Sequence, residues 1–361
     1  MTSVRLSNCR DALGQTPVRL AVAATALGAV ALLAGFALGE GGLVLAALAA
    51  AWLFFTGLAV GGVALSAIFT VAKGKWGASL LPSAEAASGF FAPSLALLAL
   101  IVLGARLWMP WAAAGGVSEW APVAARDLAG AGVLFWVGRR FLGQSRSGEA
   151  ATRRAIVYLL TYVVVLTMWT LDLVMSLHDW TSTVVPAYYF MCSLLAGLAW
   201  ATLTATLRTS SGFDSNARHD AGKLLFGFAT FCAYLLWSAF LPTWYANIPE
   251  ETGHLISRWQ GGYRPAAFVV LIAAYLYPFV SLVLERAKRS RLFLSVAALS
   301  VLVGLAADRF LLVFPSLGYS GGVQVALLGA GVAAGVFGLF ALSFGAALGA
   351  PVARKFEGPA S

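Results

Sequence analysis

The chain has 361 residues, of which 60% are hydrophobic and 11% are charged, with a formal net charge of +9 and a mean hydropathy of +0.84. This composition excludes an ordinary soluble enzyme and predicts an all-α integral membrane protein, because in lipid the backbone must satisfy its own hydrogen bonds. The apolar runs are too long and continuous for barrel strands, and a basic inner surface accounts for the positive charge without a nucleic-acid partner.

Ten apolar runs are long enough, at about 20 residues each, to cross roughly 30 Å of hydrocarbon. The fourth is short and begins beside Arg126 and Asp127. We expect one membrane domain, 1–361, in which spans two to five (43–177) and six to nine (184–314) form two four-helix bundles with flanking helices. The ten runs are 20–38, 43–71, 86–108, 122–138, 155–177, 184–207, 224–244, 266–283, 292–314 and 323–348.

Basic residues predict the orientation of the chain, because short loops rich in Lys and Arg stay on the cytoplasmic side. These loops alternate regularly with loops that carry acids such as Glu119 and Glu251. We therefore expect a multi-pass protein of the bacterial cytoplasmic (inner) membrane with both termini in the cytoplasm. The run from Leu20 is a full-length span without a convincing cleavage site, so no cleavable signal peptide is expected.

Metal-ligand patterns are missing from the sequence. The cysteines lack the spacing of a zinc or iron–sulfur site, and the histidines fall in loops or at span ends, too far from the middle of a bundle to hold a haem. We expect no cofactor held covalently or by metal ligation in this chain, so redox centres would belong to partner subunits. The residues concerned are Cys9, Cys192, Cys232, His178, His219 and His254.

Four ionisable residues fall inside predicted spans, where a charge is costly and is usually kept for pairing or transport. Arg106, Asp172, Asp308 and Arg309 all lie near the outer ends of the third, fifth and ninth spans. Asp172 comes 17 residues after position 155 and Asp308 comes 16 after position 292, so the two acids reach nearly equal depth. This equality suggests that the two bundles are parallel repeats.

Two interpretations of these charges stay open. Asp172 and Asp308 are candidate proton carriers, since Tyr158 and Thr161 lie on the same helical stripe as Asp172 and offer hydroxyls below it. Equally, each acid can be a structural partner for Arg106 or Arg309 that fixes helix packing.

A polar segment at 244–252 follows the seventh span and is expected on the outer face. Its local pattern predicts a short interfacial helix, with Pro249 at the first position and acids that complement the positive end of the helix dipole. Aromatic residues around it are typical of the membrane interface. We expect partner docking by Asn247, Glu250, Glu251 and His254, and quinone or outer-face contacts from His178, Asp179, Tyr188, Trp237 and Tyr245.

Two segments carry a family resemblance. They read WTLDLVMSLHDWTSTVVPAYYFMCSLLAG at 169–197 and WYANIPEET at 244–252. They resemble membrane subunits of alternative complex III, within the NrfD-like or polysulfide-reductase membrane-subunit superfamily, whose members have two four-helix bundles with flanking helices.

The resemblance implies a subunit of a respiratory quinol:cytochrome c oxidoreductase that contributes to quinone placement or proton translocation near the periplasmic face. It also implies iron–sulfur clusters and c-type haems in partner subunits, beside a paralogous membrane subunit, so this chain would be a subunit without bound metal. Two alternatives remain. One is the membrane anchor of a molybdenum or iron–sulfur reductase, and the other is a secondary transporter, which the repeat and the charges within spans favour.

Overall fold

The computed structural model describes residues 9, 12–74, 77–146, 151–177, 182–208, 213–319 and 322–349. Within these residues every regular element is a helix, and nine helical stretches are long and apolar enough to cross a membrane. The predicted all-α membrane architecture is confirmed at this level.

The bounds of several spans agree closely with the apolar runs, since α10 and α17 occupy the predicted ranges. Helices that form spans are α2 (Gln15–Ala37), α3 (Gly41–Val71), α4 (Leu81–Ala86) with η1 (Ala87–Phe90) and α5 (Phe91–Leu103), α9 (Thr152–Leu173) with η2 (Met175–Leu177), α10 (Val184–Leu207), α11 (Ser215–Ala246), α13 (Arg264–Val269) with η4 (Val270–Leu276) and α14 (Tyr277–Leu282), α16 (Arg291–Val313) with η5 (Pro315–Leu317), and α17 (Val323–Leu348). Shorter helices are α6 (Ala105–Trp108), α7 (Pro110–Ala114), α12 (Pro249–Trp259), η3 (Gly261–Tyr263) and α15 (Glu285–Arg289).

The fourth predicted run belongs to a longer helix, α8 (Val117–Arg146), which packs along α9 and α5. This helix is not among the nine apolar stretches. Its composition explains the difference, because Arg126 and Asp127 interrupt its apolar sequence and Arg139 and Arg140 follow near its end.

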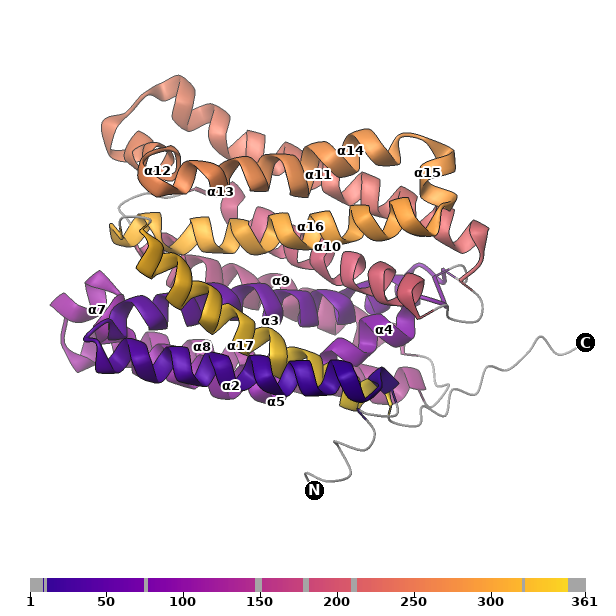
Figure 1. The fold of residues 1–361 in the computed structure, drawn as a ribbon, viewed down its shortest axis with the longest axis horizontal. Helices are drawn as coiled ribbons and strands as arrows, with labels where there is room; N and C mark the ends of the chain where they lie inside the picture. Colours follow the sequence, from indigo (N-terminus) through magenta and orange to yellow (C-terminus); the bar gives the residue numbers. More distant parts are fainter. Residues whose placement is uncertain are drawn as a thin grey trace, which may run out of the picture.

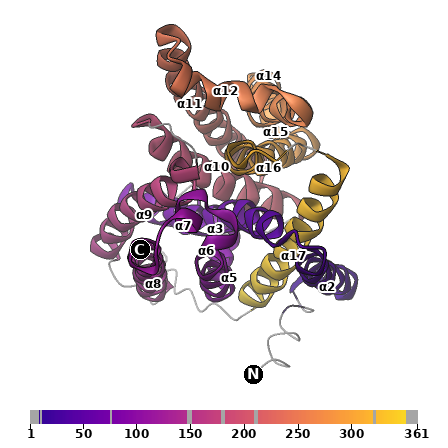
Figure 2. The same cartoon turned by 90° about the vertical axis from the view of Figure 1, so that its left-hand side faces the viewer.

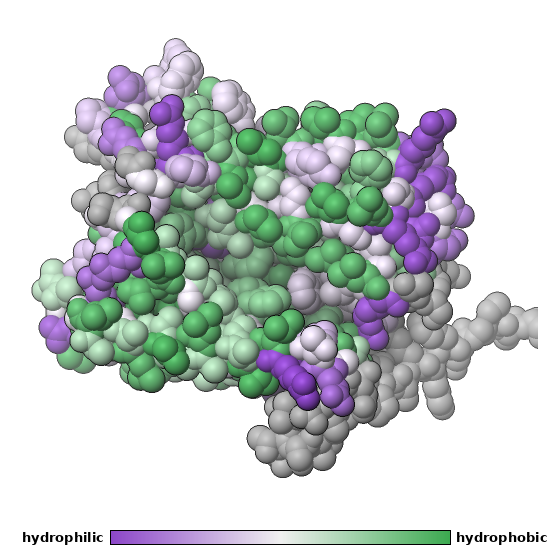
Figure 3. All heavy atoms as spheres, viewed as in Figure 1, coloured by the Kyte–Doolittle hydropathy of each residue, from purple (hydrophilic) through white to green (hydrophobic). Residues whose placement is uncertain are grey.

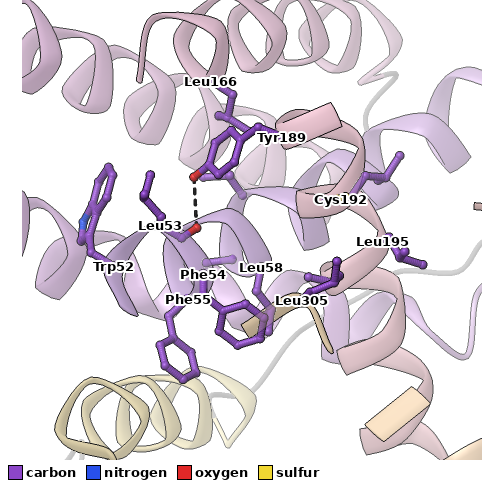
Figure 4. Close-up of a cluster of buried hydrophobic side chains, with 14 of the residues drawn as sticks. Trp52, Leu53, Phe54, Phe55, Leu58, Leu166, Tyr189, Cys192, Leu195 and Leu305 are labelled. Atoms are coloured by element: carbon purple, nitrogen blue, oxygen red, sulfur yellow. Dashed lines mark hydrogen bonds between the residues drawn. The ribbon is translucent and has the colours of Figure 1, made fainter. Parts of the chain in front are cut away.

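Helix α3 lies at the centre of the molecule (Figure 2). Almost every residue from Leu43 to Phe69 is buried. It packs against α10, α17, α9, α16 and α5. Small residues permit the closest of these approaches, since a Cβ added to Gly61 would lie 2.0 Å from the Ser193 carbonyl oxygen of α10. Elsewhere in the contact between α3 and α10, the Tyr189 hydroxyl donates to the Leu53 carbonyl at 3.0 Å (Figure 4).

Further helices attach on both sides of this centre. Helix α8 packs on α9 and α5, while α10 and α16 carry α11 and the interrupted span from α13 to α14. The first and last spans, α2 and α17, form a tight pair in which a Cβ on Gly28 would lie 2.3 Å from the Cα of Gly335.

The two ends of the helix bundle differ in chemistry. Helices α7 and α12 lie at one end, and α4 and the basic α15 lie at the other (Figure 1). Hydrophilic side chains gather at both ends, and apolar side chains cover the band between them (Figure 3). We call the end with α12 the α12 end. Helix α2 begins and helix α17 ends at the opposite end, on the same side as α15 (Figure 1).

Candidate functional site

A cavity of about 330 Å³ opens at the α12 end, between α10, α11, α12, η4 and α16. Most of its wall is apolar, as expected of a site for a small organic molecule. Trp237 and Leu271 line it and are also exposed on the outside, Trp237 to 56%, so the cavity reaches the apolar belt of the protein. An opening among apolar side chains suits a ligand that is itself apolar.

A connected set of polar side chains forms the inner wall of this cavity. The Tyr188 hydroxyl of α10 donates to Oδ1 of Asp308 on α16 at 2.8 Å and lies 2.6 Å from the Tyr275 hydroxyl. Because each hydroxyl has one proton, Tyr275 donates to Tyr188 when Tyr188 donates to Asp308. The Cys192 sulfur lies 3.8 Å from the Tyr275 oxygen and extends the chain by one group.

Arg309 balances the charge of Asp308. One of its terminal nitrogens lies 3.3 Å from Oδ2 of Asp308, and both side chains are buried. The guanidinium also stands over two aromatic rings, 4.4 Å from the centroid of Tyr189 and 5.9 Å from that of Tyr188. Attraction between a cation and an aromatic face is strongest where water is excluded, so these rings help to hold the arginine in the bundle.

The backbone around Tyr275 is π-helical, from Val270 to Leu276. Pro278 explains this local irregularity, because it has no N–H to donate to the carbonyl four residues earlier. The neighbouring helix fits closely against the widened turn. Ser300 donates to the Ala273 carbonyl at 2.6 Å, and a Cβ on Gly304 would lie 2.4 Å from the Ala274 nitrogen. The irregularity therefore fixes Tyr275 against α16.

Helix α12 confirms the short helix predicted from Pro249 and closes one side of the cavity with Glu251, His254 and Arg258. His254 is buried, and burial lowers the pKa of Arg258 to about 10. His254 lies on the inner face of this amphipathic helix and lines the cavity, so its side chain is not on the surface where we expected it to dock a partner. Asn247, which ends α11 in a left-handed conformation with φ 50°, remains exposed.

Asp172 belongs to a separate cluster at the contact between α8 and α9. Its carboxylate is paired with Arg126 at 2.5 Å, and Asp127 lies beside it. The predicted pairing with Arg106 is wrong. Arg106 follows the helix break at Gly104 and lies exposed on α6, whereas Arg126 projects from the helix that packs directly on α9.

The predicted hydroxyl track below Asp172 is not connected to it within the described residues. The Tyr158 hydroxyl donates to the Val60 carbonyl at 2.8 Å, and the Thr161 hydroxyl donates to the Val157 carbonyl at 2.8 Å. Both protons are thus committed to backbone oxygens. Tyr158 instead anchors α9 to the central helix α3.

The remaining predicted contact residues divide into three groups. Tyr188 and Trp237 line the cavity, whereas Tyr245 is exposed beyond it. His178 and Asp179 lie outside the described residues, as does the side chain of Glu250.

Several site residues were not predicted from the sequence as members of a site: Tyr275, Arg258, Arg126, Asp127 and Glu85. Glu85 is buried near the opposite end, where Ser66 donates to its Oε1 at 2.8 Å. Asp127 and Glu85 had a usable signal, because each is an acid at the edge of an apolar run. Tyr275 had none, since tyrosines are common in spans and its neighbours come from other helices.

Within the described part of the chain, no group of three or more His, Cys, Asp or Glu side chains is placed to hold a metal ion. The cavity instead combines an apolar wall with tyrosine, carboxyl and histidine groups. That combination can hold a planar apolar molecule with polar substituents and exchange protons with it. Comparisons with protein-family models and with curated proteins give no match to this chain.

Proposed function

We propose that this protein is an integral membrane subunit of a respiratory quinol:cytochrome c oxidoreductase of the alternative complex III type. In this proposal the chain holds quinone or quinol in the cavity at the α12 end and conducts protons there, near the periplasmic face. One observation carries the proposal: an apolar cavity that reaches the membrane belt ends on the hydrogen-bonded chain Tyr275–Tyr188–Asp308.

The chemistry of the cavity fits a quinone in three respects. Its apolar wall suits a hydrocarbon ring and tail, and the opening beside Trp237 suits entry from lipid. Its polar wall offers a carboxyl group joined to tyrosines, which can accept protons when a quinol is oxidised. The electrons would pass to iron–sulfur and c-haem centres in partner subunits, beside a paralogous membrane subunit.

The placement of the helices supports the same proposal. Helices α3, α5, α8 and α9 would be the first four-helix bundle, and α10, α11, the span from α13 to α14, and α16 the second, which makes ten spans with α2 and α17. With the basic helix α15 in the cytoplasm, both termini are cytoplasmic and the α12 end is periplasmic.

Binding of a quinone analogue to the purified chain in nanodiscs tests the cavity. We expect saturable quenching of tryptophan fluorescence. The affinity should fall about fivefold in Tyr188→Phe or Asp308→Asn, because one hydrogen bond contributes roughly 1 kcal/mol. Tyr158→Phe is the matched control, since this buried tyrosine bonds to Val60 outside the cavity. Equal binding by all variants, or no saturable binding, would contradict the proposal.

Co-purification in mild detergent tests the assignment to a complex. We expect iron–sulfur and multihaem c-type subunits together with a second membrane subunit. A molybdenum enzyme as the partner would favour the reductase-anchor alternative. A chain that purifies alone would contradict both.

The transporter alternative is favoured by one specific observation, the π-helical interruption that borders the cavity at Val270–Leu276. Interrupted helices often line transport sites. Solute uptake by liposomes that contain only this chain would support that function over the respiratory one.

A further inference from the structure

A second buried acidic group lies away from the cavity, where α8 packs on α9. Asp127 is 1% exposed, and neither of its carboxylate oxygens has a hydrogen-bond donor among the described residues. The indole of Trp169 points to the Asp127 backbone carbonyl, at 3.5 Å, and so does not serve the carboxylate. An ionised carboxylate in such a position would cost several kcal/mol.

Among the residues that the structure describes, the side chain placed to pair with the Asp127 carboxyl group is another acid. Asp172 lies within hydrogen-bonding reach of it, and Arg126 is already paired with Asp172 through a single terminal nitrogen that lies 2.5 Å from each carboxylate oxygen. Two ionised carboxylates and one arginine would leave a net negative charge here. One proton between the acids makes the cluster neutral and supplies the missing donor.

We propose that Asp127 and Asp172 form a proton-binding carboxyl pair, in which protonated Asp127 donates to the carboxylate of Asp172 and Arg126 holds that carboxylate in place. Among the described residues, two charged groups face Asp127. Arg126 comes from its own helix and Asp172 from α9, while the packed helices α3 and α5 contain no titratable residue.

The geometry also gives the proton a direction. Exposure rises from 1% for Asp127 to 12% for the Asp172 side chain and 51% for the Arg126 side chain. A proton held by Asp127 reaches the surface by one transfer to Asp172, which weakens the pairing of Asp172 with Arg126, and by a second transfer to water. Both acids are then ionised beside Arg126 until another proton binds. The Asp127–Asp172 pair is separate from the cavity at the α12 end. A negative result for the pair would therefore not affect the proposal that the cavity binds a quinone.

Infrared spectroscopy of the purified chain labelled with aspartate carrying ¹³C in the side-chain carboxyl group tests the proposal. We expect a label-sensitive carboxylic-acid C=O band at neutral pH that disappears in Asp127→Asn. In Asp172→Asn the band should also be lost at neutral pH, because Asp127 is then the single carboxyl group beside Arg126 and its charge is balanced without a proton. Asp127→Glu serves where the asparagine variant does not fold, and there the band should become insensitive to the aspartate label.

Two results would overturn the carboxyl pair. One is a wild-type spectrum with no label-sensitive acid band, or with one that Asp127→Asn and Asp127→Glu leave unchanged, which would mean that Asp127 is ionised. The other is an acid band that Na⁺ abolishes at constant pH, which would mean that the two acids hold a cation rather than a proton.

Discussion

Removal of the Asp308 carboxylate should destabilise the protein strongly, because it leaves Arg309 buried without its counter-charge. Breaking a buried ion pair costs about 3–5 kcal/mol. Here the arginine keeps its contacts with the Tyr188 and Tyr189 rings, each worth up to about 2 kcal/mol when water is excluded, so we expect the lower end of the range. Asp308→Ala should therefore lower the free energy of unfolding by about 3 kcal/mol, roughly a hundredfold in the equilibrium constant.

Equilibrium unfolding in mixed micelles with increasing SDS, followed by tryptophan fluorescence, measures this change. Asp220→Ala is the control, since Asp220 pairs with Lys223 on an accessible part of α11 and should contribute less than about 1 kcal/mol. The double variant Asp308→Leu with Arg309→Met should regain most of the loss, because it removes both charges. An Asp308→Ala variant no less stable than Asp220→Ala would show that the buried pair with Arg309 does not stabilise the protein.

Two further predictions follow from packing and from charge. Gly61→Ala should destabilise the contact between α3 and α10 by about 1–3 kcal/mol in the same assay. The control Gly227→Ala has open space around it and should be neutral or stabilising by up to about 1 kcal/mol. Equal effects of the two substitutions would contradict the close approach of the helices at Gly61. The hydrogen bond from Arg289 lowers the pKa of Glu285. Protection of the α15 amides from hydrogen exchange should therefore be complete above the ordinary glutamate pKa of 4.5 and be lost as the pH falls through the lowered value. The variant Glu285→Gln should remove this pH dependence.

Hydropathy predicted most of the spans because the length and polarity of a run depend on the sequence alone. The bounds 184–207 and 323–348 agree with α10 and α17. The prediction was too short at α8, because Arg126 and Asp127 interrupt its apolar sequence. The predicted run covers 122–138, whereas the helix has 30 residues. Helical structure there depends on packing against α9, which composition does not record.

Position along a helix was easier to predict than rotation about its axis. Asp172 and Asp308 were both expected near the outer end, but their partners depend on which face of each neighbouring helix is turned towards them. Arg106 was predicted as a partner because it lies near the same end of its helix as the acids, whereas Arg126 lies on the face of α8 that is turned towards Asp172. The cavity could not be predicted for the same reason. Tyr275 lies in a π-helical stretch and is joined to Asp308 by way of Tyr188, and the three residues come from helices far apart in the sequence.

Photolabelling asks directly whether the cavity at the α12 end binds a quinone. The purified chain in nanodiscs is irradiated with a photoreactive quinone analogue, and the labelled peptides are mapped by mass spectrometry. We expect labels on cavity residues such as Trp237, Leu271 and Leu255, and their loss when unlabelled quinone is added in excess. Labels confined to other helices, or labels that excess quinone does not displace, would contradict binding of a quinone there.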